Sequence, residues 1–484
     1  MNYPGLNLNR KLHLYLLILF LSLYAASGCK MRKTRDNKPV ICTIDLQDIK
    51  ELGKIVAVTD YNSTEYFLYR GEPMGYQYDL LKELANHLQV KLEVIVENDL
   101  QKTFEYLNSG KCDLIALNLT VTAERSKKVD FTIPHSQTRQ VLVQRKPENW
   151  KIMHPERLES QLLRNQLELA GERIYVRNNS AFATRLHNLA DEIGDSIHII
   201  EVPEDEEELI RLVANGEINY TVCDENVALV NQTYYPILDV QTAISFPQNL
   251  AWAVRKDVSA NLLKEINEWL LTFRKTTKFA VIYNKYFKNQ KSKERVESDF
   301  FAVSSGRISP WDEYIKSYSD SLGWDWLLLT SMIYQESRFD PTINSWAGAY
   351  GLMQLMPSTA ERYSIGKRSS PEENIEAGVK FLKWLDEVLM DRVPNENQRI
   401  KFILASYNVG LGHVLDAMNL ARKNGKNPRI WDDNVDYYLL NKSDPEFYRD
   451  PVVKYGYCRG EEPYNYVSEI LERYDHYKNI IGIN

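Results

Sequence analysis

The stretch Trp326-Leu-Leu-Leu-Thr-Ser-Met-Ile-Tyr-Gln335, followed by Glu336-Ser-Arg-Phe-Asp340-Pro341, decides the fold of the second half of the chain. Its first ten residues are mostly apolar, which is typical of a helix that is buried on most of its sides. Pro341 cannot continue a helix, and its ring pushes the preceding residue towards extended geometry. We therefore expect a buried helix whose last turn contains Glu336.

Helical patterns surround this stretch from residue 309 to residue 484. Ser370-Pro371-Glu372-Glu373 predicts a helix start, with Ser as the N-cap and Pro at the first helical position. Residues 358–361, Ser-Thr-Ala-Glu, predict a second capping box. The apolar residues that then recur at helical spacing are Ile375, Val379, Leu382, Leu385 and Leu389. We expect residues 309–484 to form a compact, mainly α-helical domain.

The first half of the chain has a different pattern, in which short β-branched runs alternate with amphipathic stretches. Residues 55–58, 92–96, 113–117 and 173–176 predict strands, and residues 80–88 predict a helix. This alternation predicts α/β units packed around sheets. Residues 288–308 are rich in Lys, Glu and Ser, and we interpret them as a linker.

Composition excludes several classes of protein. The 484 residues are 44% hydrophobic and 26% charged, which is ordinary for a globular chain and rules out disordered, collagen-like and polytopic membrane proteins. The formal net charge is −7. A mildly acidic chain is unsuited to broad nucleic-acid binding, which needs many cationic contacts to phosphates. We expect no nucleic-acid partner.

The N-terminus predicts export. Arg10 and Lys11 precede an apolar run over residues 12–23, which is too short to span a bilayer and is typical of a signal peptide. Residues 26–29, Ala-Ser-Gly-Cys, resemble a bacterial lipobox, and this resemblance implies a signal peptide over residues 1–28 and lipidation of Cys29. The alternative is an ordinary signal peptide with an incidental cysteine.

A basic segment follows, and residues 29–50 predict a tether close to anionic lipid head groups. We expect the chain at the periplasmic face of the outer membrane. Lys30 favours this location, because Asp at the position after a lipidated cysteine often signals retention at the inner membrane. The remaining cysteines are Cys42, Cys112, Cys223 and Cys458. Their wide spacing matches no metal template, so we expect no metal and no cofactor. Both disulfide pairing and free buried thiols remain open.

Three segments of the first half carry a family resemblance: Gly75-Tyr-Gln-Tyr-Asp-Leu80, residues 107–134, and residues 212–224. Together with Tyr283-Asn-Lys-Tyr-Phe287, they resemble family 3 of the bacterial extracellular solute-binding proteins. The resemblance implies a two-lobed α/β periplasmic-binding-protein fold over residues 51–287, with a ligand cleft between the lobes.

The residues of this half also indicate what such a cleft would bind. Arg125 follows Thr120 closely, and a guanidinium can grip a carboxylate through two parallel charged hydrogen bonds. Asp224 ends a predicted strand and could meet an ammonium. We therefore expect an amino acid or a peptide, such as a muropeptide, as the ligand. The resemblance implies that Asp60 and Ser180 also line the cleft; the alternative for each residue is a structural ion pair or cap.

Glu336 is the candidate catalytic residue. A carboxylate in the last turn faces the negative end of the helix dipole, and partial burial would raise its pKa further. A carboxyl that stays protonated near neutrality is what a general acid at a glycosidic oxygen requires. A Glu at a helix end is usually structural when it is considered alone, so the neighbouring motifs decide the interpretation.

Three further motifs follow Glu336-Ser337: residues 345–357 with Gly-Leu-Met-Gln, residues 405–410 with Tyr-Asn-Val-Gly, and residues 462–467 with Tyr-Val. In this order they resemble the family 1 lytic transglycosylases, which share the goose-type lysozyme fold. The resemblance implies an exo-acting lyase that cleaves the β-1,4 bond between N-acetylmuramic acid and N-acetylglucosamine and leaves 1,6-anhydromuramoyl ends. It implies that Glu336 is catalytic. The glycan strand would be bound by Ser345, Met353, Gln354, Tyr407, Asn408 and Tyr466.

The order of the two halves suggests that a ligand in the first modulates murein cleavage by the second. Two other functions remain open. One is a transport-associated binding protein with an inactive C-terminal domain. The other is a lysozyme-like hydrolase, in which Asp340, Glu461 or Glu462 would hold the attacking water.

Overall fold

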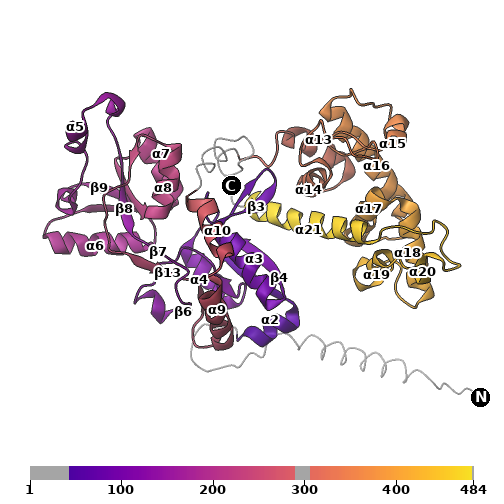
Figure 1. The fold of residues 1–484 in the computed structure, drawn as a ribbon, viewed down its shortest axis with the longest axis horizontal. Coiled ribbons are helices and arrows are strands. Elements are labelled where there is room, and N and C mark those ends of the chain that lie inside the picture. Colours follow the sequence, from indigo (N-terminus) through magenta and orange to yellow (C-terminus); the bar gives the residue numbers. More distant parts are fainter. Residues whose placement is uncertain (1–42, 289–305, 482–484) are drawn as a thin grey trace, which may run out of the picture.

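The computed structural model describes residues 43–288 and 306–481. The predicted signal peptide, Cys29, and most of the predicted tether and linker lie outside these residues. The described residues form a two-lobed α/β unit followed by a helical unit (Figure 1). This arrangement agrees with the expected fold class.

The first lobe is built on a five-stranded sheet in the order β4-β1-β5-β14-β6. Its strands are β1 (Lys54–Thr59), β4 (Lys91–Val96), β5 (Leu114–Ile115), β6 (Val129–Phe131) and β14 (Ala253–Arg255). Its helices are α2 (Leu46–Leu52), α3 (Tyr76–Leu88), α4 (Leu100–Ser109), α9 (Ala260–Phe273) and α10 (Thr277–Phe287). β1 pairs in parallel with β4 and β5, so their carboxyl ends meet at one edge, where side chains can converge on a ligand.

The second lobe has its own sheet in the order β10-β9-β11-β8-β12. Its strands are β8 (Gln140–Arg145), β9 (Arg173–Arg177), β10 (His198–Val202), β11 (Tyr220–Asp224) and β12 (Leu238–Asp239). Its helices are α5 (Pro155–Glu159), α6 (Ala181–Ile193), α7 (Glu206–Asn215) and α8 (Glu225–Tyr234). The antiparallel strands β7 (Ser136–Thr138) and β13 (Gln248–Leu250) lie between the lobes (Figure 1). The strands predicted from the sequence are confirmed as β1, β4, β5 and β9.

A short hairpin of the first lobe, β2 (Phe67–Tyr69) and β3 (Glu72–Met74), lies beside the helical unit. The helices of that unit are α13 (Asp312–Leu322), α14 (Trp326–Ser337), α15 (Pro357–Arg362), α16 (Pro371–Leu389), α17 (Glu396–Val409), α18 (Leu411–Lys423), α19 (Asp436–Leu440), α20 (Pro445–Tyr448) and α21 (Glu461–Ile481). The predicted buried helix is α14, in which Leu329, Met332 and Ile333 are fully buried.

One of the two predicted capping boxes is confirmed, and the other is wrong. Ser370 caps α16: its hydroxyl accepts from the Glu373 amide, and Glu373 accepts from the Ser370 amide. Residues 358–361 form no such box, because α15 begins at Pro357, two residues before the start at Thr359 that a Ser358 cap predicts. The fixed φ of Pro357 suits the first helical position, and this places Ser358 inside the helix instead of at its cap.

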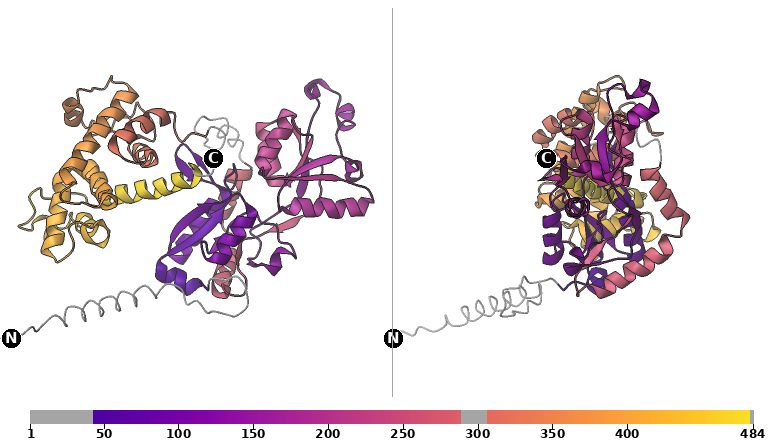
Figure 2. Two further views of the ribbon diagram at one scale, coloured as in Figure 1. Left: turned by 180° about the vertical axis from the view of Figure 1, so that it is seen from behind. Right: turned by 90° about the vertical axis from the view of Figure 1, so that its left-hand side faces the viewer.

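Helix α21 connects the helical unit with the first lobe (Figure 2). Both ring nitrogens of its His476 lie within hydrogen-bonding distance of tyrosine hydroxyls, 2.7 Å from that of Tyr66 and 3.2 Å from that of Tyr78. The Tyr477 hydroxyl donates to the Gly71 carbonyl at 2.8 Å. Apolar side chains of the first lobe belong to the same core as those of α14. The helical unit is therefore packed directly onto the first lobe.

Three other features concern the described residues alone. Cys112, Cys223 and Cys458 are buried free thiols, so these three are not paired with one another. No cluster of metal-ligating side chains is present in the described part of the chain. Among the helices of residues 43–288 and 306–481, none combines the length and apolar character that a membrane span requires.

Candidate active site and ligand cleft

Glu336 lies in the last turn of α14, as the sequence predicts. Arg338 and Phe339 follow with φ of 51° and 65°, a left-handed turn that stops the helix directly after Ser337. Helix α21 packs along α14, and the Ser331 hydroxyl donates to the Ile470 carbonyl at 2.7 Å. This contact fixes the register in which α21 presents Tyr466 to Glu336.

The Tyr466 hydroxyl donates a short hydrogen bond to Glu336 Oε1. Burial raises the pKa of Glu336 from 4.5 to about 8, and the Tyr466 hydrogen bond opposes this shift only in part. No carboxylate in the described residues contributes to the shift. Glu336 is therefore a protonated acid near neutral pH because its surroundings desolvate the charged form.

Tyr407 and Met353 form the next layer of the site. Tyr407 lies in the last turn of α17, and its hydroxyl donates to the Met353 carbonyl at 2.7 Å. Burial raises the pKa of Tyr407, and the nearby charge of Glu336 raises it further. The Met353 side chain is fully buried, and the Tyr407 hydroxyl bonds to its backbone carbonyl. The structure thus brings Glu336, Tyr407 and Tyr466 together.

A tight loop carries two more of the predicted residues. Gln354 has a φ of 45°, and its amide donates to the carbonyls of Gly351 at 2.8 Å and Ile343 at 3.1 Å. The Ser345 hydroxyl accepts from the Ala349 amide at 2.9 Å. Both side chains hold the loop in shape in this structure.

The remaining predicted residues of the C-terminal site are Asn408 and the three acidic residues that would hold water in a hydrolase. Asn408 is half-buried in the last turn of α17. Asp340, Glu461 and Glu462 are exposed. Asp340 accepts from the backbone amide and the hydroxyl of Thr342, at 2.8 Å and 2.7 Å, and these contacts lower its pKa. Asp340 thus caps the turn after α14.

The predicted ligand residues of the first half line one cavity between the lobes. Asp60, Thr120, Arg125, Ser180 and Asp224 all contribute to its wall. Arg125 lies at the turn after Thr120, and its guanidinium donates to the Thr120 carbonyl at 3.1 Å. Burial lowers the pKa of Arg125 to about 10, although Asp224 opposes this shift. Burial and the repulsion of Glu206 raise the pKa of Asp224 to about 8, against the attraction of Arg125.

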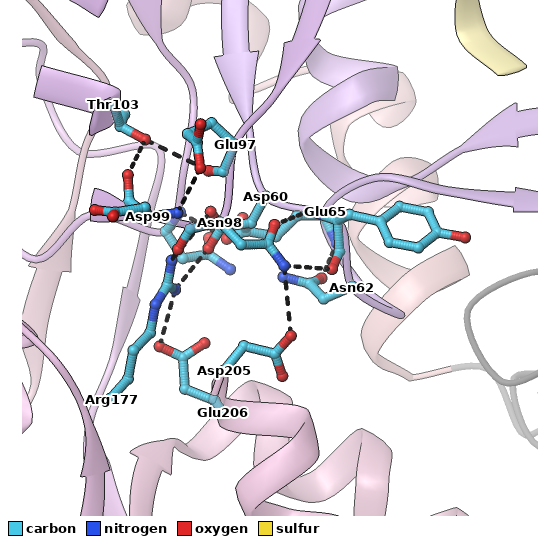
Figure 3. Close-up of polar contacts among 12 residues, drawn as sticks. Asp60, Asn62, Glu65, Glu97, Asn98, Asp99, Thr103, Arg177, Asp205 and Glu206 are labelled. Carbon is cyan, nitrogen blue, oxygen red and sulfur yellow. Dashed lines mark hydrogen bonds and ion pairs between the residues drawn. The ribbon is translucent and has the colours of Figure 1, made fainter. Parts of the chain in front are cut away.

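The sequence did not predict the partner of Asp60. Arg177, at the end of β9, reaches across the cleft, and its guanidinium lies 2.8 Å from Asp60 Oδ2 and 3.4 Å from Glu206 Oε1 (Figure 3). It also donates to the Asn98 carbonyl. Arg177 directly follows the strand predicted over residues 173–176. Ligand crevices form at the carboxyl ends of strands, so this position could have indicated that Arg177 lies at the cleft.

An acidic run over residues 201–208 also contributes to the cleft. It starts α7 with Asp205 as the N-cap. Glu206 contacts Arg177, and Glu207 accepts from the hydroxyl and amide of Ser63 in the other lobe. Burial raises the pKa of Glu207 to about 7. These carboxylates face the interlobe cleft because α7 begins at its edge.

Fold and site together define a lytic transglycosylase domain of lysozyme-like type joined to a solute-binding domain. The family model of bacterial extracellular solute-binding proteins, family 3, matches residues 54–289, and that of the transglycosylase SLT domain matches residues 313–430. The chain is 36% identical to membrane-bound lytic murein transglycosylase F of Desulfosudis oleivorans, over 89% of this chain and 91% of that protein. It is 31% identical to the protein of the same name from Saccharophagus degradans, over 88% of this chain and 82% of that protein.

The chain belongs to the membrane-bound lytic murein transglycosylase F family, and it is a peptidoglycan lytic transglycosylase. Among solved structures, it is similar to an ancestral amino acid-binding protein described as a precursor of cyclohexadienyl dehydratase. That similarity has a TM-score of 0.43 and 23% identity, and covers 50% of this chain and 99% of that one.

Proposed function

We propose that Glu336 performs both proton transfers in cleavage of the β-1,4 bond between N-acetylmuramic acid and N-acetylglucosamine. As an acid it protonates the glycosidic oxygen, and the bond from C1 to that oxygen breaks. As a carboxylate it then takes the proton of the muramoyl 6-hydroxyl while that oxygen bonds to C1. The products are a 1,6-anhydromuramoyl end and a free 4-hydroxyl, and no water is consumed.

The observation that carries this proposal is the isolation of Glu336 from other carboxylates. Ordinary glycosidases need a second carboxylate as nucleophile or base. In the described residues, only the neutral Tyr466 hydroxyl bonds to Glu336, and burial dominates its pKa. A single acid suffices when the nucleophile belongs to the substrate, and this favours the lyase over the hydrolase.

The remaining site residues have supporting roles in this proposal. Tyr466 orients the Glu336 carboxyl and stabilises its charged form between the two proton transfers. Tyr407 and Asn408, from the end of α17, and Gln354, from the facing loop, orient the sugar and its N-acetyl group. Ser345 and Met353 hold that loop in place through the contacts to Ala349 and Tyr407.

Mass spectrometry of digested murein tests the reaction. Purified chain should release muropeptides with anhydro ends, and Glu336→Gln should release none. Glu313→Gln is a matched control, because Glu313 is an exposed residue of α13 and pairs with Lys316 in the next turn. Digestion to reducing ends would show a hydrolase, and activity of Glu336→Gln would remove the assignment.

We also propose that the cleft of the N-terminal domain binds an amino acid or a peptide, and that the bound ligand modulates murein cleavage. Helix α21 supports this idea physically, because one end carries Tyr466 and the other carries His476 and Tyr477 on the first lobe. A rigid helix shared by both units can transmit a lobe movement to the site.

Titration of amino acids and stem peptides, followed by tryptophan fluorescence and by murein cleavage, tests the modulation. We expect both signals to respond in the wild-type chain and neither to respond in Arg125→Ala. Cleavage that is unchanged while fluorescence responds would disprove the coupling and leave the binding intact.

Finally, we propose that a lipid on Cys29 anchors the chain to the periplasmic face of the outer membrane. The lipobox-like residues 26–29 support this, as do the names of the relatives, which describe them as membrane-bound. Labelling with a fatty-acid analogue should mark the wild-type chain and Cys42→Ser. Cys29→Ser should lose the label and leave the membrane fraction; a label retained on this variant would contradict the anchor.

A further inference from the structure

The interlobe cavity holds two sets of polar groups that differ in whether they have partners. The cavity is lined from the first lobe by Asp60, Glu65 and Arg125, and from the second by Ser180 and Asp224, with Arg177 between the lobes. Its volume is about 50 Å³. The two sets indicate which part of a ligand the cavity can accept.

The first set, the Asp224 carboxylate and the Ser180 hydroxyl, has no hydrogen-bond partner among the described residues. Asp224 Oδ1 and the Ser180 hydroxyl form no hydrogen bond with any described residue, although each side chain belongs to a residue that is only 6% exposed. A buried polar group without a partner is unfavourable, so such a group normally binds a ligand or a water molecule. Arg125 lies near Asp224; its guanidinium donates to the backbone carbonyls of Thr120 and Asn179, and it forms no ion pair with a carboxylate of the described residues. Together they suit an ammonium and a carboxylate on one carbon atom.

The second set is already satisfied, by the protein itself. Arg177 is 4% exposed, and its guanidinium is held by Asp60, Glu206 and the Asn98 carbonyl (Figure 3). Asp60 directly follows β1 of the first lobe, whereas Arg177 ends β9 of the second. The guanidinium therefore fills the part of the cleft between the two strand ends, and no ligand group can occupy that part while Arg177 stays there.

We propose that the Arg177 side chain occupies part of the cleft and thereby limits its ligands to small zwitterionic amino acids, namely glycine, L-alanine or D-alanine. A water-sized group needs roughly 10–15 Å³ of such space, so a cavity of about 50 Å³ holds roughly three to five non-hydrogen atoms. Glycine and alanine have nearly this size. This inference rests on the proposed amino acid binding by the N-terminal domain and names its ligand class.

The same geometry says what removal of Arg177 would do. In Arg177→Ala the space beside Asp60 and Glu206 is empty, and two buried carboxylates lose their cation. Leaving a buried charge unpaired is strongly unfavourable, so the site would gain affinity for a ligand that brings a cation of its own. Arginine and lysine supply such a group, whereas glutamate adds another negative charge.

Isothermal titration of the full chain in detergent tests the proposal with glycine, L-alanine, D-alanine, L-arginine and L-glutamate. The wild-type chain should bind glycine or an alanine and should bind arginine at least about tenfold more weakly. Arg177→Ala should reverse this order and still reject glutamate. Arg211→Ala is the matched control, because Arg211 pairs with Glu208 at the surface of the same lobe, and it should behave as wild type.

Failure of this inference can be told apart from failure of amino acid binding as such. If wild type and Arg177→Ala both bind arginine as tightly as alanine, the Arg177 assignment is wrong, and the binding function stands. If neither protein binds any of the five amino acids, amino acid binding itself falls, and this inference falls with it. An alanine preference that survives in Arg177→Ala would also overturn the role of Arg177.

Discussion

Replacement of Glu336 by Gln should stabilise helix α14, which carries this residue, at neutral and basic pH. Burial raises the pKa of Glu336 from 4.5 to about 8 in the folded chain. Below pH 4.5 the carboxyl is protonated in both the folded and the unfolded states. Its burial then destabilises the fold little, because no charge is removed from water. As the pH rises towards 8, the unfolded chain gains from ionisation and the folded chain does not, so stability is lost over this range.

The size of this loss follows from the shift. At about 1.4 kcal/mol per pKa unit, a change from 4.5 to about 8 corresponds to roughly 4–5 kcal/mol. Glu336 is partly exposed, and water screens part of this energy, so we expect about 2 kcal/mol. Gln has no such dependence on pH, and its amide oxygen can still accept from Tyr466.

Hydrogen–deuterium exchange of the α14 amides measures the difference in stability between wild type and Glu336→Gln. A local measurement is needed because the chain contains several folded units. At pH 8, Glu336→Gln should exchange roughly thirtyfold more slowly than wild type, after correction for the intrinsic rate, and near pH 5 the two should nearly agree. Murein cleavage by the same variant should fall by at least about a hundredfold. Glu313→Gln should change neither property. An active variant, or exchange that shows no pH-dependent gap, would refute the reasoning.

Three other predictions concern contacts of the helical unit. Tyr466→Phe removes the hydrogen bond that opposes the raised pKa of Glu336, so murein cleavage should fall about tenfold to a hundredfold and the basic limb of its pH profile should move upwards; an unchanged profile would count against the contact. Lys442→Met leaves Asp416 as a buried unpaired charge and should cost about 3–5 kcal/mol in urea denaturation; a smaller loss than for the exposed Lys380→Met would contradict the pairing. Burial lowers the pKa of His476 to about 4, so the packing of α21 on the first lobe should weaken as the pH falls from about 6.5 to 4, and proteolysis near α21 would report it. His476→Gln should lose this dependence, and a wild-type interface equally resistant at both pH values would disprove it.

Much of the C-terminal site could be predicted because its signals are local. A nearly continuous apolar run predicts α14, and Pro341 places the end of that helix, so Glu336 is positioned by residues that are close to it in the sequence. Tyr407 is likewise placed at the end of α17 by its own helix. Burial of Glu336, and with it the raised pKa, could be predicted in direction because the whole helix is apolar.

The contacts that could not be predicted join distant parts of the chain. Arg177 and Asp60 are separated by 117 positions and meet only because two lobes close on each other. The packing of His476 on Tyr66 spans 410 positions and depends on the length and direction of α21. The failed capping box at residues 358–361 has a local cause, because Pro357 is a stronger helix-start signal than the pattern that follows it.

The most direct test of the central claim is digestion of murein in water labelled with heavy oxygen. If the muramoyl 6-hydroxyl attacks C1 with Glu336 as the only acid and base, the new muramoyl ends carry no label. If a water molecule attacks instead, each new end carries one heavy oxygen atom, and the assignment of Glu336 to both proton transfers is wrong.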